Sequence, residues 1–180
     1  MRDEAPPAAA LRDGRGLFFV LAAGLLLVLL ATIGRLPPVV ASHFDAHGAP
    51  NGWSSRAVYG GLILLIGVVL PLGIVWLVHA VTRQGPELLN IPARDYWRRP
   101  EHGAEAVRRA RAYMWWLASI MAGVALAVHG LIVRANASST PRLSTPAIVA
   151  LLGGVLLAIG SWSVGWWLVL RPPPAGRPTA

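Results

Sequence analysis

The sequence predicts an all-α membrane protein, a bundle of four transmembrane helices with both termini in the cytoplasm. Hydrophobic residues make up 55% of the 180-residue chain and charged residues only 13%, and the mean hydropathy is +0.55. A soluble domain of this size has too little interior to hide so much apolar surface. The apolar residues are gathered in four stretches, each long enough to cross a hydrocarbon core of about 30 Å at about 1.5 Å per residue.

These stretches divide the chain into two helix hairpins. They run from Leu17 to Ile33, Val58 to Val81, Tyr113 to Val133 and Ile148 to Leu170. The expected organisation is an N-terminal tail (1–15), a first helix hairpin (16–82) with an outer loop (35–56), a cytoplasmic connection (83–112), a second helix hairpin (113–170) and a C-terminal tail (171–180). A signal peptide is the alternative for the first stretch. Its apolar run is too long for an ordinary signal, and Arg35 follows it directly.

The orientation is predicted from the arginines, which account for all sixteen basic residues of the chain. Twelve of them lie in the two tails and in the connection 83–112, whereas the two other loops hold only Arg35, Arg56, Arg134 and Arg142. Arginine close to a span stays on the cytoplasmic side. Both termini and the connection should therefore face the cytoplasm. This placement explains the net charge of +8 as topology control, so nucleic acid is not an expected partner.

The residues that are missing also restrict the function. No Asp, Glu, Lys or Arg lies inside a predicted span, although ion-coupled transporters and proton pumps normally need such groups at membrane depth. His79 and His129 lie near span ends, where we expect solvated, structural histidines. The absence of cysteine excludes disulfides, thiolate catalysis and thiolate metal sites. No cofactor is expected.

Two features of the spans predict how the helices pack. Small residues recur at four-residue spacing in the third and fourth spans, which should let the two backbones approach closely. They are Ser119, Gly123 and Ala127 in one helix and Ala150, Gly154, Ala158, Ser161 and Gly165 in the other. Pro71 removes one backbone donor and should bend the second span near its middle.

The outer loop has the most specific sequence of the chain. Pro37 and Pro38 should end the first helix and favour an extended path. The segment Pro50–Gly52 predicts a turn, because Pro fixes φ while Asn and Gly tolerate positive φ. Trp53 is then placed to anchor the returning chain in the headgroup layer.

His43, Asp45 and His47 alternate along this loop, so an extended chain would project all three to one side. Imidazole and carboxylate ligands suit Zn²⁺ or a similar ion. The alternative is that Asp45 caps a turn and that the histidines are merely solvated. No fourth ligand is evident, and no metal site is predicted.

The loop resembles the family of bacterial domains of unknown function, number 1648, found at the start of SdpI-type immunity and signal-transduction membrane proteins. The residues that carry the resemblance are Leu36, Pro37, His43, Phe44, Asp45, Gly48, Pro50, Asn51, Gly52, Trp53 and Arg56. The resemblance implies a protein of the bacterial cytoplasmic membrane. Proteins of the SdpI type protect their producer against a secreted toxin and relay its presence by holding a repressor at the membrane, so the resemblance also implies a ligand-sensing outer loop.

The connection between the second and third spans carries a second motif, which is similar to shorter relatives of this family. Its residues are Asn90, Pro92, Asp95, Tyr96 and Trp97. Pro100 and Glu101 resemble a helix start. The arginines around this start should face anionic lipid, or else a protein partner such as a repressor; they are Arg98, Arg99, Arg108, Arg109 and Arg111.

The sequence therefore predicts a binding, sensing or immunity protein of the inner membrane, without catalysis of its own. The expected partners are the lipid bilayer, a peptide ligand or toxin outside and a repressor or other protein in the cytoplasm. The alternative is a membrane enzyme, or an accessory subunit of a transporter, that uses the outer loop as its site. An adjacent toxin or repressor gene would favour the first function, and an adjacent ATPase or permease gene the second.

Overall fold

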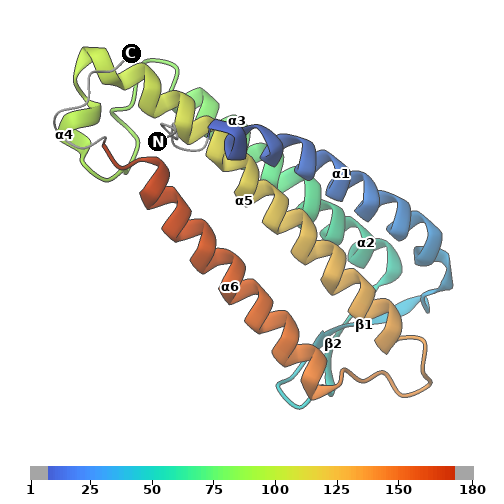
Figure 1. Cartoon of the computed structure of the whole chain (residues 1–180). Helices are drawn as coiled ribbons and strands as arrows, with labels where there is room; N and C mark the ends of the chain where they lie inside the picture. Colours follow the sequence, from blue (N-terminus) through green and yellow to red (C-terminus); the bar gives the residue numbers. More distant parts are fainter. Residues whose placement is uncertain (1–7, 173–180) are drawn as a thin grey trace.

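The computed structural model of the chain describes residues 8–172, and within this range four helices are long and apolar enough to cross a membrane. The helical membrane class is therefore confirmed. The elements, labelled as in Figure 1, are α1 (Ala8–Thr32), η1 (Ile33–Arg35), β1 (Val39–Phe44), β2 (Pro50–Ser55), α2 (Arg56–Leu64), η2 (Leu65–Val69), α3 (Leu70–Val81), α4 (Arg94–Trp97), α5 (Pro100–Ala135) and α6 (Thr145–Val169).

Two helices begin more than two turns before their apolar stretches. Helix α1 starts at Ala8, inside the segment expected to be a tail, and α5 starts at Pro100, where the sequence predicts a helix start. The remainder of the two predicted tails, 1–7 and 173–180, lies outside the described residues. Helical structure thus extends well beyond the hydrocarbon region at one end of the bundle, which we call the α4 end. The β1–β2 hairpin lies at the opposite, hairpin end (Figure 1).

Helix α5 is the centre of the bundle. It packs against α1, η2 and α3 and also contacts α6, whereas α6 stands apart from the other helices along much of its length (Figure 1). The side of α5 that faces the other helices is lined by small residues, including Ala106, Ala110, Ala118, Ala122 and Ala125, all at most 3% exposed. Because small side chains let helix backbones approach, this row explains why α5 is surrounded.

The second span contains a π turn, η2, between α2 and α3. Pro71 has no N–H to donate, and the N–H of Leu70 bonds to the carbonyl of Leu65, five residues earlier. A π turn therefore lies just before Pro71, where the sequence predicts a bend. Within this turn, Gly67 lies against α1 and α5. An added Cβ would overlap the Leu25 side chain and lie 2.8 Å from the Cβ of Ala125.

The prediction that α5 and α6 pack closely through their small residues is wrong for most of these residues. Nothing lies within 4 Å of a Cβ placed on Gly154, and the hydroxyl of Ser119 donates instead to the carbonyl of Gly14 in α1. The two faces line an apolar groove of about 410 Å³, formed by Gly123, Val124, Ala127, Leu131, Ala147, Ala150, Leu151, Gly154 and Val155.

Aromatic side chains occupy part of the space between α5 and α6. Tyr113 stacks on Trp162 and donates its hydroxyl to the Trp162 carbonyl at 3.1 Å. A Cβ on Gly165 would overlap the Tyr113 hydroxyl, so Gly165 is the α6 glycine at which the two helices approach closely. Trp166 adds a third ring to this cluster.

We expect Gly67→Val to lower the thermal stability of the protein in detergent, because the new side chain must displace Leu25 and Ala125. Overpacking of this kind typically costs about 1–3 kcal/mol. Gly154→Val is the matched control, since open space surrounds that glycine, and its melting temperature should stay close to that of the wild type. Equal destabilisation by the two variants, measured by thermal unfolding in the same detergent, would contradict this packing.

Candidate binding site

The outer loop folds into an antiparallel hairpin in which Val39 pairs with Ser55 and Phe44 with Pro50, with an irregular register between Ala41 and Phe44. The chain reverses between Asp45 and Ala49, where the Asp45 N–H donates to the Ala49 carbonyl at 2.9 Å. The turn predicted at Pro50–Gly52 is therefore wrong, because these residues belong to β2. Of the described glycines, Gly48 and Gly85 have positive φ, and Gly52 does not.

Asp45 explains why the reversal falls there. Its Oδ1 accepts hydrogen bonds from the backbone N–H groups of His47 (2.9 Å) and Ala49 (2.8 Å). A side-chain acceptor that binds the following N–H groups closes a turn locally. Gly48, at φ 77°, supplies the left-handed residue that completes it. Turn capping by Asp45, one of the two alternatives considered, is thus the arrangement found.

The two histidines of the loop do not converge on Asp45. The Nδ1 of His43 lies 3.0 Å from the Ser42 hydroxyl, and both His43 and His47 are exposed. Within residues 8–172, no group of three His, Cys, Asp or Glu side chains is placed to hold a metal ion. The histidines are therefore available as separate surface groups.

Asn136, which follows α5, fixes the hairpin to the bundle. Its Oδ1 accepts from the N–H of Ala41 at 2.9 Å, and its Nδ2 donates to the Ala41 carbonyl at 3.0 Å and to the Ile132 carbonyl at 2.9 Å. The α5–α6 loop adds a second attachment, since the Leu143 N–H donates to the Gly48 carbonyl at 3.0 Å. Both attachments are hydrogen bonds to the hairpin backbone. They hold the hairpin in one position and do not involve its exposed side chains.

A buried polar cluster lies at the same end of the bundle and joins three helices. The Thr32 hydroxyl donates to the Val28 carbonyl at 2.6 Å, so its oxygen accepts from the Nε2–H of His129 at 2.8 Å. The Nδ1 of His129 then accepts from the Tyr59 hydroxyl, also at 2.8 Å. His129 is 0% exposed, so the expectation that it is solvated is wrong. Every polar atom of the imidazole has a partner, which makes the cluster a fixed joint between α1, α2 and α5.

Some of the remaining residues of the loop hold the hairpin against the bundle, and others are exposed on its surface. Phe44 packs against the core below the hairpin, and Arg56 donates to the carbonyls of Gly34 and Pro37 at the end of the first span, each at 3.5 Å. Side chains alternate along β2, so the exposed Asn51, Trp53 and Ser55 lie on one side of the hairpin, and Val39 is paired with Ser55; we call these four residues the hairpin face. Val39 and Trp53 are 60% and 58% exposed. His43 is paired with Gly52 and lies on the other side. An exposed indole beside an amide is typical of a recognition surface.

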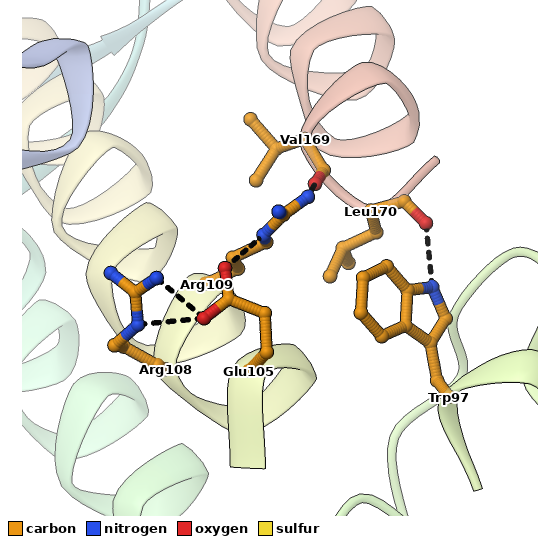
Figure 2. A network of polar contacts seen from close by, with 6 residues as sticks. All are labelled: Trp97, Glu105, Arg108, Arg109, Val169 and Leu170. Carbon is orange, nitrogen blue, oxygen red and sulfur yellow. Dashed lines mark hydrogen bonds and ion pairs between the residues drawn. The ribbon is translucent and has the colours of Figure 1, made fainter. Parts of the chain in front are cut away.

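At the α4 end, the second motif has a structural role. Trp97 is 2% exposed, and its Nε1–H donates to the Leu170 carbonyl at the end of α6, at 2.7 Å (Figure 2). Tyr96 stacks on the His102 ring with 4.0 Å between centroids. Pro92 is half-buried, while Asn90 and Asp95 are exposed.

Sequence reasoning missed how the arginines of α5 close the ends of neighbouring helices. Arg109 donates to the Val169 carbonyl at 2.9 Å and to Glu105 at 2.6 Å, as Figure 2 shows. Glu105 lies before the apolar part of α5; burial raises the pKa of its carboxyl, but hydrogen bonds and charges from Arg109 and Arg108 outweigh burial and lower the pKa overall. Arg111 donates to the carbonyls of His79 and Thr82 at the end of α3. The spacing of these arginines along one helix was the sequence feature that could have indicated these contacts.

The fold and the site define a multi-pass helical membrane protein with a small β-hairpin fixed at one end. Residues 19–70 match the model of the family described as a domain of unknown function (DUF1648), which confirms the family that the loop motif predicts. The match runs from α1 through the hairpin into the start of α3. No curated protein and no solved structure matches the chain.

We expect Gly48→Val to loosen the hairpin from the α5–α6 loop. A β-branched residue at positive φ costs about 1–3 kcal/mol, and its Cβ would overlap the carbonyl of Leu143. Hydrogen exchange of the Asp45 and Leu143 amides should therefore become faster than in the wild type. His47→Ala, an exposed change in the same turn, is the control and should leave both amides protected. Unchanged exchange in Gly48→Val would show that this contact does not hold the loops together.

Proposed function

We propose that the protein is a multi-pass protein of the bacterial inner membrane that binds an extracytoplasmic peptide ligand or toxin through its hairpin face, in sensing or immunity. The observation that carries this proposal is the way the hairpin is fixed. Its backbone is held by Asn136 and Leu143, while Val39, Asn51 and Trp53 remain exposed. A preorganised surface loses less conformational entropy on binding than a mobile loop does.

The chemistry of this face favours recognition over catalysis. Asp45, the carboxylate nearest to the exposed histidines in the sequence, uses Oδ1 to cap its own turn. Trp53 offers a large apolar surface, and Asn51, two residues earlier on the same side of β2, offers hydrogen-bonding groups next to it. A peptide with an apolar residue and free backbone groups matches such a surface. The SdpI-type proteins that the motif resembles act on a secreted toxin, which agrees with a ligand on this side.

The second part of the proposal concerns orientation and relay. The distribution of the arginines supports an orientation with the α4 end in the cytoplasm and the hairpin outside. Helix α5 is in contact with both ends, because Asn136 holds the hairpin and Arg109 and Arg111 hold the ends of α6 and α3. Ligand binding that shifts the hairpin would act on α5 directly, and a cytoplasmic partner such as a repressor would detect the change at the α4 end.

The orientation is testable because the chain has no cysteine of its own. Ser139→Cys, in the exposed α5–α6 loop, should react with a membrane-impermeant maleimide in intact spheroplasts. Ala104→Cys, exposed near the start of α5, should react only after lysis. Labelling followed by a gel-shift assay measures both, and the reverse pattern would contradict the proposed orientation.

Binding through the hairpin face is tested by site-specific photo-crosslinking. A photoreactive amino acid at Trp53 should form an adduct with a secreted peptide when membranes are mixed with the peptide fraction of medium conditioned by the producing bacterium. The same group at Val149, which is 63% exposed on α6, is the control and should form no peptide adduct. The adduct at position 53 should weaken when Asn51, on the same side of β2, is replaced by Ala. Equal adducts at the two positions, or none at Trp53, would contradict the proposed site.

A further inference from the structure

A cavity of about 710 Å³ lies at the α4 end, between the segment that follows α3 and the first turns of α5. Its wall carries a single carboxylate, that of Glu87, and a set of five arginines: Arg83, Arg98, Arg99, Arg108 and Arg111. The apolar part of the wall comes from Pro86, Val107 and other residues. A cavity with such an excess of positive charge favours the binding of an anion.

Most of these guanidinium groups are not neutralised by protein carboxylates. In the described part of the chain, the ion pairs are those of Glu105 with Arg108 and Arg109. Arg83, Arg98 and Arg99 form no ion pair there and are exposed. The cavity therefore has several positive groups free to contact a ligand.

Arg111 is held in place by the protein itself. Its Nε donates to the Thr82 hydroxyl at 2.8 Å, and its Nη2 donates to the carbonyls of Thr82 at 3.0 Å and His79 at 3.2 Å. Thr82 is 2% exposed. No hydrogen bond from Nη1 of Arg111 is found among the described residues, so one end of this positioned guanidinium remains available. The positioned Nη1 can donate a charge-assisted hydrogen bond to a phosphate oxygen.

The depth of the cavity indicates where the phosphate comes from. Its lining includes Thr82, one residue after α3 ends, and Arg111, two residues before the apolar part of α5 begins. Tyr96, whose ring type favours the headgroup layer, is partly exposed on the neighbouring α4. We infer from these positions that the cavity lies at the level of the phospholipid phosphates, where its apolar wall residues would meet the glycerol and the first methylene groups.

We propose that this cavity binds the phosphate group of an anionic phospholipid. Arg111 provides the fixed contact, Arg83, Arg98 and Arg99 surround the headgroup, and Val107 and Pro86 meet its apolar part. This assignment is independent of the hairpin face, which lies at the other end of the bundle (Figure 1).

The test is titration of the full-length protein in neutral detergent with phosphatidylglycerol, followed by native mass spectrometry. The site variant is Arg83→Gln with Arg99→Gln; Arg111 is left intact because it closes the end of α3. Each arginine near an anionic headgroup contributes about a fivefold change in affinity, so the double variant should bind roughly 25-fold more weakly. The matched control is Arg35→Gln with Arg134→Gln, two exposed arginines at the hairpin end, and it should bind like the wild type.

Two further arms distinguish the source of the phosphate. Phosphatidylcholine, which has the same phosphodiester but no net charge, should bind far more weakly than phosphatidylglycerol. Inorganic phosphate at matched ionic strength should not displace the lipid. The proposal is overturned if the site variant keeps wild-type affinity, if the control loses as much as the site variant, or if inorganic phosphate displaces the lipid, since the ligand would then be a soluble phosphate.

Discussion

The structure depends on a constraint at the membrane boundary: the last carbonyls of each helix have no partner within the helix and need one elsewhere. Helix α5 supplies these partners for two of its neighbours. Arg111 bonds to the end of α3, and Arg109, with Trp97 of α4, bonds to the end of α6. At the other end, Asn136 bonds to both backbone groups of Ala41. The bundle is therefore organised around one long helix.

This arrangement gives the two ends of the molecule different properties. At the hairpin end, the buried His129 is satisfied by Thr32 and Tyr59, and the hairpin backbone is held by α5 and the α5–α6 loop. The exposed side chains can therefore serve recognition without unfolding the support. At the α4 end, the arginines around the cavity outnumber the carboxylates that line it, and the proposed lipid site rests on this excess of positive charge.

Helix α6 is the least integrated part of the fold. It is attached to the rest of the fold at Trp97 and Arg109 at one end, near Leu143 at the other, and at Tyr113, which bonds to Trp162. An apolar groove separates another part of it from α5. Inside lipid there is little hydrophobic force to close such a groove, because acyl chains are as apolar as the side chains.

The sequence alone determined the four spans, the helix start at Pro100 and the family motif, because span length, apolar composition and residue order are local properties. Tertiary structure decided which glycines matter. Gly67 and Gly48 are needed for contacts with residues far along the chain, whereas Gly154 and Gly52, favoured by local pattern, are not used as predicted. The turn moved to Asp45 because its carboxylate caps the backbone there. His129 became a buried joint because Thr32 and Tyr59, 97 and 70 residues away, satisfy both ring nitrogens; spacing along the chain cannot reveal such partners.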